Sequence, residues 1–297
     1  MKPRFAPLVA LLFAAGSCAT SAVNRGQGAS PNETDAGTGP IFTPADPSYT
    51  VVTAQPEGAV YAHSATVLYR LTIGQGATAA MRIGKFTGVS DSVVDIALNS
   101  ESKAYAATND ALYQLNTDTA ACTKVASGSF PNSLSFVPVG TVDASAEALV
   151  GYLGSDYVRI ALNGKVTVVR GNALGDGLES SGDMVSVASK SFLTVRATVN
   201  CNDAQCNQCK SQDCIVQVSP TTGALLKFRG GIARQNVYGL AFWAGTAYGF
   251  TATGGAFSLD LESTSPIPVS LPFQDGTETL SFYGAGSTTA APASSVK

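Results

Sequence analysis

The chain has 297 residues and a formal net charge of −3 at pH 7; 45% of its residues are hydrophobic and only 13% are charged. This length and hydrophobic content are sufficient for one large domain, or two small ones, with a substantial core. The slightly acidic balance and the lack of any run of Lys and Arg argue against a nucleic-acid-binding protein, which would carry a basic patch.

The N-terminal residues have the layout of an export signal. Two basic residues precede the apolar stretch Leu8–Ala15, which is too short to span a bilayer as a helix. The sequence Ala15-Gly16-Ser17-Cys18 follows, and it resembles the lipobox of bacterial lipoproteins, in which Leu is usual where this chain has Ala15. The resemblance implies that Cys18 is acylated and anchors the protein in a membrane. The alternative is an ordinary signal peptide in which Cys18 has no special role.

Residues 19–56 show no hydrophobic periodicity and are rich in Ala, Ser, Thr, Gly and Pro. Such a composition predicts a flexible tether. After residues 1–18, the signal peptide and lipidated Cys, this tether would hold a folded domain away from the bilayer. By the sorting rule of the lipoproteins, Ala19 favours the outer membrane, so we expect a lipid-anchored protein of the cell envelope, on the periplasmic or the surface face.

A repeating pattern of four strands organises the rest of the chain. Between residues 93 and 125, four short apolar runs are separated by three breaks rich in turn-forming residues, which predicts a four-stranded meander. First strands of the same kind begin near residues 93, 134, 183, 237 and 279. A period of about 40 to 50 residues with four strands per repeat is typical of propeller blades. In this respect the chain resembles the bacterial β-propeller repeat proteins.

The two ends of the repeat region complement each other. Residues 57–86 contain three strands with no first strand before them, and Leu280–Ala285 is a first strand with no blade after it. Propellers commonly build one blade from both chain ends, which removes the free edges. We therefore expect an all-β propeller over residues 57–285, with five four-stranded blades closed by the C-terminal strand; a sandwich and a sixth, degenerate blade are the alternatives. Residues 286–297 are predicted to be a disordered tail.

Four of the six cysteines lie in an insertion at residues 200–214 of the fourth blade: Cys201, Cys206, Cys209 and Cys214. In an exported protein such a segment is most often a disulfide framework, so we expect a protruding hairpin loop with two disulfides. A Cys₄ zinc site and a redox-active Cys206–Cys209 pair are the alternatives. Of the three possible pairings, the nested Cys201–Cys214 with Cys206–Cys209 suits a hairpin best, and Cys201–Cys209 with Cys206–Cys214 stays open. Cys122 is then unpaired, and we expect a small buried residue.

No set of residues stands out as catalytic. His63 is the only histidine, and a catalytic base also needs a nucleophile and an orienting group within reach. Asp95 is a carboxylate within a predicted first strand. Acidic residues in the Gly-rich stretch 171–183 could bind Ca²⁺, although a solvated acidic loop is the more ordinary interpretation; they are Asp176, Glu179 and Asp183. We expect no catalytic residue, no metal and no cofactor.

The preferred interpretation is a binding module, displayed by its lipid anchor, that takes a protein or glycan ligand and no nucleic acid. The propeller face and the Cys-rich loop would make the contacts, with Phe242 and Trp243 as candidate binding residues because aromatic rings offer large apolar contact surfaces. The alternative is an extracellular hydrolase or lyase with carboxylates near the propeller axis. Two carboxylates about 5–10 Å apart in a pocket would favour that enzyme. A structural subunit of an envelope assembly is a third interpretation.

Overall fold

The structure is a computed structural model, and it describes residues 60–74, 77–263, 269–271, 274–275 and 278–292. The signal segment, Cys18 and the tether lie outside these residues, so the expectations about them stay predictions. Within the described part of the chain, no helix is long and apolar enough to cross a membrane.

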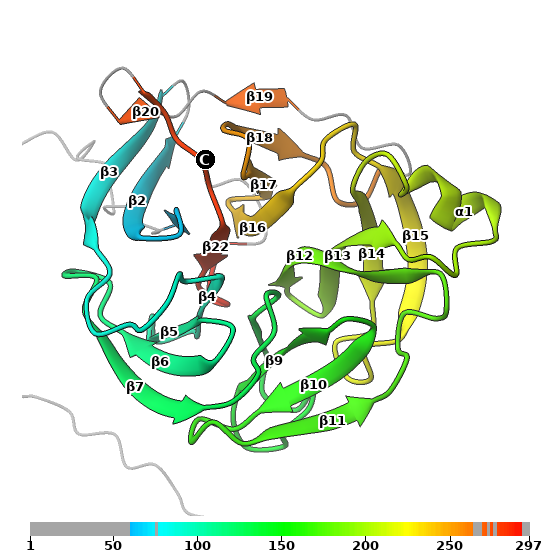
Figure 1. Ribbon diagram of the computed structural model, residues 1–297, viewed down its shortest axis with the longest axis horizontal. Coiled ribbons are helices and arrows are strands. Elements are labelled where there is room, and N and C mark those ends of the chain that lie inside the picture. The colour runs from blue at the N-terminus through cyan, green and yellow to red at the C-terminus, as the bar shows by residue number, and fades with distance from the viewer. Residues whose placement is uncertain (1–59, 75–76, 264–268, 272–273, 276–277, 293–297) are drawn as a thin grey trace, which may run out of the picture. The chain divides into compact units, whose positions relative to one another are not determined.

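Five four-stranded antiparallel sheets surround a central axis as the blades of a propeller (Figure 1). The predicted fold class and blade number are confirmed. The strands of each blade are given from the innermost to the outermost. Blade 1 consists of β22 (Gly284–Ser287), β1 (Val60–His63), β2 (Val67–Gly74) and β3 (Ala77–Lys85), and blade 2 consists of β4 (Asp95–Leu98), β5 (Ala104–Ala107), β6 (Ala111–Leu115) and β7 (Cys122–Ser127). Blade 3 consists of β8 (Ser135–Val137), β9 (Ala148–Leu153), β10 (Asp156–Ile160) and β11 (Val166–Arg170), blade 4 of β12 (Leu178–Val187), β13 (Lys190–Ala197), β14 (Cys214–Val218) and β15 (Leu225–Gly231), and blade 5 of β16 (Val237–Trp243), β17 (Thr246–Thr251), β18 (Ala256–Leu259) and β19 (Val269–Leu271). A short pair, β20 (Gln274–Asp275) and β21 (Glu278–Thr279), precedes β22.

Blade 2 shows how the sequence pattern produces a blade. All residues of its two inner strands are buried, because each blade packs against a neighbour on both faces, whereas its outer strand β7 is mostly exposed. The side-chain oxygen of Asn99 shapes the turn between β4 and β5, since it accepts hydrogen bonds from the N–H of Glu101 (3.1 Å) and of Lys103 (2.8 Å). Short apolar runs and Asn-rich breaks therefore translate directly into strands and turns.

The hydrophobic core is divided among the five junctions between neighbouring blades. One cluster of buried residues lies at each junction. Aromatic pairs occupy these clusters, such as Tyr152 with Tyr157 (ring centroids 5.1 Å apart) and Phe250 with Phe282 (5.2 Å). Large rings fill the space between flat sheets, which is the packing role expected for most of the strand aromatics.

Blade 1 is built from both ends of the described chain. β22 pairs antiparallel with β1, with Gly284 opposite His63 and Ser287 opposite Val60. Closure by the C-terminal strand is therefore confirmed. However, the closing strand is Gly284–Ser287, which lies further along the chain than the predicted Leu280–Ala285 and includes two residues that were assigned to the tail.

The sequence predicted the closing strand at the wrong residues because β22 is made of small residues, which the crowded propeller axis requires, and not of the alternating apolar residues that mark a strand. A Cβ on Gly284 would lie 2.3 Å from His63 Nε2, and a Cβ on Gly286 would lie 2.9 Å from the carbonyl oxygen of Ile96. Only glycine fits where an inner strand approaches its neighbours this closely. Leu280 and Phe282, which suggested a strand, are instead buried in the cluster between blades 5 and 1.

The cysteine segment folds compactly against blade 4 and is not a protruding hairpin. Two disulfides are confirmed, and they join Cys201 to Cys206 and Cys209 to Cys214. Both pairings proposed from the sequence are wrong, because no hairpin sets Cys201 opposite Cys214; β13 and β14 pair with Val195 opposite Cys214. Each of the four sulfurs is bonded to one partner sulfur, so none is a thiolate available to zinc.

A single helical turn explains the observed pairing. Asp203 caps the short helix α1 (Ala204–Gln208), since its carboxylate accepts hydrogen bonds from the N–H of Gln205 (2.8 Å) and of Cys206 (2.9 Å). The helix shortens the segment, so that Cys206 lies close to Cys201 and Cys209 lies close to Cys214. All four cysteines are buried in the cluster between blades 3 and 4, so the disulfides belong to the core.

Cys122 is the remaining cysteine of the described region. It begins β7, is buried and forms no disulfide. Burial raises the pKa of its thiol to about 11, so the group stays protonated at neutral pH and behaves as the small apolar residue that was expected.

Removal of β22 should destabilise the propeller strongly. A chain that ends at Tyr283 leaves β1 with an unpaired edge and loses about four backbone hydrogen bonds of about 1 kcal/mol each. For a domain of this size we expect the melting temperature to fall by roughly 10 °C. A chain that ends at Pro292 serves as the control. Equal melting temperatures for both truncated chains and the full chain would contradict closure by β22.

Candidate functional site

Two buried carboxyl groups meet at the propeller axis. Asp95 begins β4 and Asp183 lies in β12, neither has any exposed surface, and the two side chains are hydrogen-bonded to each other. Each also accepts one backbone N–H from the next residue in sequence and one from the following blade. The four donors are Ile96 (2.8 Å) and Leu134 (2.5 Å) to Asp95, and Met184 (2.6 Å) and Leu240 (2.8 Å) to Asp183. The pair therefore links the inner strands of blades 2, 3, 4 and 5.

One proton is shared between these carboxyls. Burial raises the pKa of both groups well above the usual range for aspartate, because an ionised carboxylate loses its hydration there. The negative charge of Asp95 and the hydrogen bond to it raise the pKa of Asp183 further. At least one of the two carboxyls is therefore protonated at neutral pH and can donate to the other, since two carboxylates in contact cannot both be ionised.

His63 lies beside this pair, at the end of β1. Its ring is buried, and Nδ1 lies 2.9 Å from the carbonyl oxygen of Ser64, which can only accept, so Nδ1 carries the proton. Nε2 has no hydrogen-bond partner within the described part of the chain. Burial lowers the pKa of His63 to about 4, so the ring is neutral at pH 7. Both Nε2 and Asp95 Oδ1 lie within 3 Å of the position that a Cβ on Gly284 would occupy.

This geometry differs from the carboxylate pair that a hydrolase needs. Asp95 and Asp183 are at the axis, but they are in direct contact, buried and committed to backbone amides, whereas glycosidase carboxylates flank a bound substrate. The interpretation of Asp183 as part of a solvated loop is wrong, because Leu178–Val187 is the inner strand of blade 4. Asp176 and Glu179 do not join it in a metal site: over the described residues, no three His, Cys, Asp or Glu side chains are grouped to hold an ion.

An open cavity of about 290 Å³ lies over the buried pair, at the end of the axis where the inner strands begin. All five blades contribute to its lining through residues near the start of inner strands, near the end of second strands, or in nearby turns. One aromatic or polar residue from each blade determines which ligands the cavity can bind: Tyr283 of blade 1, Asn109 of blade 2, Asn132 of blade 3, Arg196 of blade 4 and Tyr238 of blade 5. We call this the mouth cavity.

The mouth cavity presents aromatic rings and uncommitted polar groups. The rings of Tyr238 and Tyr283 lie 6.1 Å apart, and Tyr283 is 40% exposed. The side chains of Asn109 and Asn132 are exposed and make no hydrogen bond to any described residue. Arg196 pairs with Glu179 through Nε (2.8 Å), and its terminal N–H groups make no hydrogen bond to any described residue. The lining includes neither Asp nor Glu.

The cysteine segment contacts the strand β13, which carries one residue of the mouth cavity lining. Arg196 lines the cavity, and the next residue, Ala197, donates its N–H to the carbonyl oxygen of Cys209 (3.1 Å). The two disulfides therefore stiffen the chain beside this part of the rim. The segment was expected to contact the ligand, but none of its residues lines the mouth cavity.

The two predicted aromatic binding residues lie at the other end of β16. Phe242 is buried and lines a larger cavity between blades 4 and 5. Trp243 is partly buried and packs against the cluster between blades 5 and 1. Neither residue contributes to the mouth cavity, so the two do not form one surface at the channel mouth.

Comparisons with known proteins identify no family. No protein-family model matches the sequence, and no curated protein is significantly similar to it. A protein of unknown function from Bacteroides caccae is similar in structure with a TM-score of 0.43 and 8% identity, over 78% of this chain and 98% of that one. The hydrazine synthase of Kuenenia stuttgartiensis has a TM-score of 0.37 and 11% identity, over 73% of this chain and 80% of that one. Neither likeness bears on the function of this chain.

The shared proton makes stability depend on pH. The raised pKa of the carboxyl pair means that the folded protein keeps a proton which the unfolded chain loses above about pH 4, so the free energy of unfolding falls as pH rises through this range. His63 has the opposite effect, since its pKa is lowered from 6.5 to about 4, and it offsets the fall up to about pH 6.5. Above pH 6.5 we expect a net loss of about 1.4 kcal/mol per pH unit until the pair ionises.

Urea denaturation between pH 6.5 and 8.5 tests this expectation. Asp183→Asn should lower stability at pH 6.5, because one backbone hydrogen bond is lost, but should flatten the decline with pH. Parallel pH profiles for the wild type and the variant would show that the pair holds no proton at neutral pH.

Proposed function

We propose that this protein is a binding module of the cell envelope that recognises a neutral glycan in the mouth cavity. The observation that carries the proposal is the lining itself, in which a pair of aromatic rings and two uncommitted amides surround a concave site at the propeller axis. Binding sites commonly combine apolar walls with a few polar groups that fix orientation.

The free polar groups suit a ligand with many hydroxyls. An Asn side chain offers two donors and one acceptor oxygen, so Asn109 and Asn132 together match hydroxyl groups, which both donate and accept. The exposed ring of Tyr283 offers an apolar face to the C–H groups of a sugar ring, and its hydroxyl adds a further donor or acceptor. Peptide backbones also offer donors and acceptors, but a sugar ring presents hydroxyls at its edge and C–H groups on its face together, which matches amides beside tyrosine rings.

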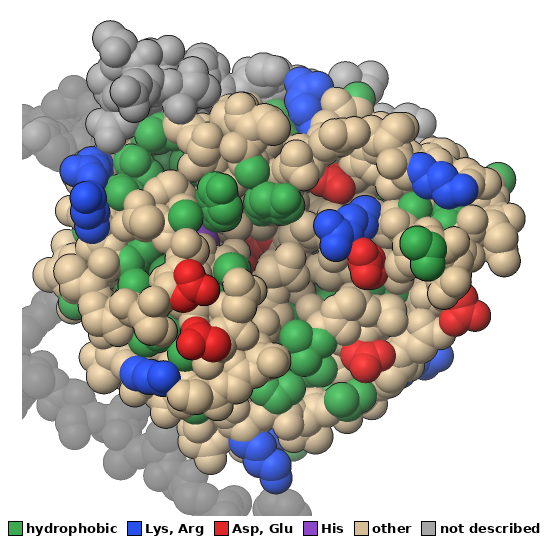
Figure 2. Space-filling model, in the orientation of Figure 1, with side chains coloured by type: hydrophobic (Ala, Val, Ile, Leu, Met, Phe, Trp, Pro, Cys, Tyr) green, Lys and Arg blue, Asp and Glu red, His purple; other side chains and the backbone are tan. Residues whose placement is uncertain are grey.

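The charges at the cavity favour a neutral ligand. Among the described residues that line the cavity, Arg196 alone is charged, and Glu179 already neutralises it. On the face of the molecule seen in Figure 2, acidic and basic side chains are intermingled, without a region of one sign. No carboxyl group lines the mouth cavity to protonate a glycosidic oxygen, so the site supports binding better than hydrolysis.

Two features of the structure keep the mouth cavity rigid. The hydrogen-bonded pair Asp95–Asp183 fixes the inner strands beneath the cavity, and the disulfides stiffen the chain next to Arg196. A site that is already ordered loses less entropy when it binds a ligand. In this proposal the Cys-rich segment supports the rim, which is the part it plays in recognition.

We also propose that the lipobox-like sequence at Cys18 anchors this module in the outer membrane. The support is the sequence alone: a short apolar stretch, small residues before Cys18, and Ala19 after it. A tether of about 40 residues between anchor and propeller would leave the mouth cavity free to meet its ligand.

Titration calorimetry with neutral and acidic oligosaccharides tests the proposed function. We expect a neutral oligosaccharide to bind, Asn132→Ala to weaken binding about 5-fold through the loss of about 1 kcal/mol, and Tyr283→Ala to weaken it about 10-fold or more. Asn163→Ala, in the exposed turn between β10 and β11, is the matched control and should bind like the wild type. If no oligosaccharide binds, or if Tyr283→Ala binds as tightly as the control, the proposal is wrong.

A further inference from the structure

A second cavity, larger than the mouth cavity, lies between blades 4 and 5, at the opposite end of the inner strands. Its volume is about 580 Å³, within the range of small-molecule sites. The walls are apolar, and each of the main wall residues is less than 10% exposed: Phe192, Phe242, Ala247, Leu259 and Leu261. The turns between β12 and β13 and between β16 and β17 form its edge. We call this the inter-blade cavity.

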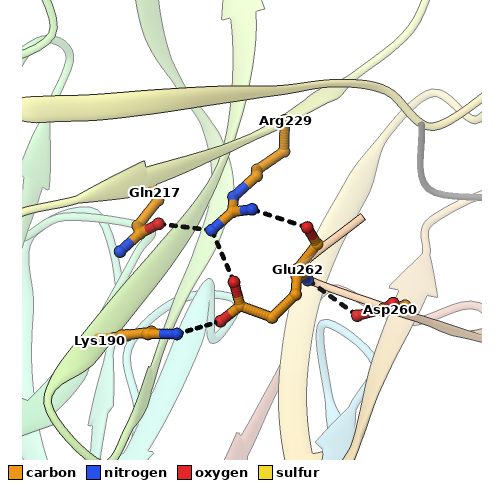
Figure 3. Close-up of polar contacts among 5 residues, drawn as sticks. All are labelled: Lys190, Gln217, Arg229, Asp260 and Glu262. Atoms are coloured by element: carbon orange, nitrogen blue, oxygen red, sulfur yellow. Dashed lines mark hydrogen bonds and ion pairs between the residues drawn. The ribbon is translucent and has the colours of Figure 1, made fainter. Parts of the chain in front are cut away.

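A buried arginine fixes one wall of this cavity. The Arg229 side chain is only 4% exposed and donates to the carbonyl oxygen of Glu262 (2.7 Å), to Gln217 Oε1 (2.5 Å) and to Glu262 Oε2 (2.8 Å), as Figure 3 shows. Its guanidinium also lies over the ring of Phe192, 5.7 Å from the centroid. These contacts hold Glu262 and Phe192 in place whether or not a ligand is bound.

Of the charged groups at the edge of the inter-blade cavity, Lys190 keeps hydrogen-bond donors that a ligand can use. Both carboxylate oxygens of Glu262 are occupied, one by Arg229 and the other by Lys190 Nζ (2.6 Å), and the hydrogen bond from Lys190 is the main cause of the lowered pKa of Glu262. Asp260 turns back to accept the N–H of Glu262 (2.8 Å), as Figure 3 shows. The Lys190 side chain is half exposed, and its ammonium keeps two N–H donors that no described residue accepts.

We propose that the inter-blade cavity is a second ligand site, which takes an apolar molecule that carries one anionic group. The apolar body lies against Phe192, Phe242 and Leu259, and the anionic group meets the free donors of Lys190. The charges of Lys190, Arg229, Asp260 and Glu262 cancel at this edge of the cavity. The two unused N–H donors of Lys190 are therefore the feature that complements a single anionic group. This site is independent of the mouth cavity and of the proposed glycan ligand.

Two fluorescent probes of similar shape test the proposal: anionic 8-anilinonaphthalene-1-sulfonate and uncharged N-phenyl-1-naphthylamine. We expect both to bind the folded protein at one site, with the anionic probe about 10-fold tighter. Lys190→Gln should remove that preference while the neutral probe still binds, and Lys103→Gln, at an exposed ion pair in blade 2, is the matched control.

Cavity-filling variants locate the binding. Ser258→Trp and Thr246→Trp each place a large side chain into the inter-blade cavity and should abolish binding of both probes, whereas Thr123→Trp on the exposed strand β7 should not. Thermal melts identify any variant that fails to fold, and two filling positions keep the test decisive. The proposal is overturned if neither probe binds, if binding survives both filling variants, or if Lys190→Gln leaves the preference for the anionic probe unchanged.

Discussion

The hydrogen bond between Asp95 and Asp183 is the interaction on which the rest of the structure depends. A propeller has no central element, so its inner strands must be held to one another across the axis. Here two carboxyls and one proton do this by accepting four backbone N–H groups from four blades. Removal of either side chain would leave buried donors without acceptors, which costs about 1–3 kcal/mol for each donor.

Blade 1 completes the circle of blades in a different way, because the backbone of its inner strand β22 packs directly against neighbouring strands. The small residues of β22 let its backbone pass beside His63, Asp95 and Ile96, where any larger side chain would collide. The same convergence of strands creates the mouth cavity, because the beginnings of inner strands, the ends of second strands and neighbouring turns are brought together there. The features that close the fold thus also assemble a rigid concave site, as a pre-organised binding module requires.

The sequence predicted features that repeat and missed features that occur once. The period of first strands and the Asn-rich breaks were sufficient for five blades and for closure by the C-terminus. The Gly284–Ser287 strand carries no hydrophobic alternation, and Asp183 reads as part of a polar loop, so neither could be recognised from local pattern. The disulfide pairing depended on one capped helical turn at Asp203.

The residues of the mouth cavity could not be predicted because turn residues such as Asn109 and Asn132 have the same composition whether they bind a ligand or only solvent. These residues become candidate binding residues only because the propeller arrangement brings all five blades to one cavity above the Asp95–Asp183 pair. Carbon-detected NMR of the aspartate carboxyls tests that geometry most directly. The account predicts that one carboxyl of the Asp95–Asp183 pair stays protonated at pH 7, and that Asp183→Asn removes this signal. Ionisation of both groups near pH 4, as in an unfolded chain, would contradict it.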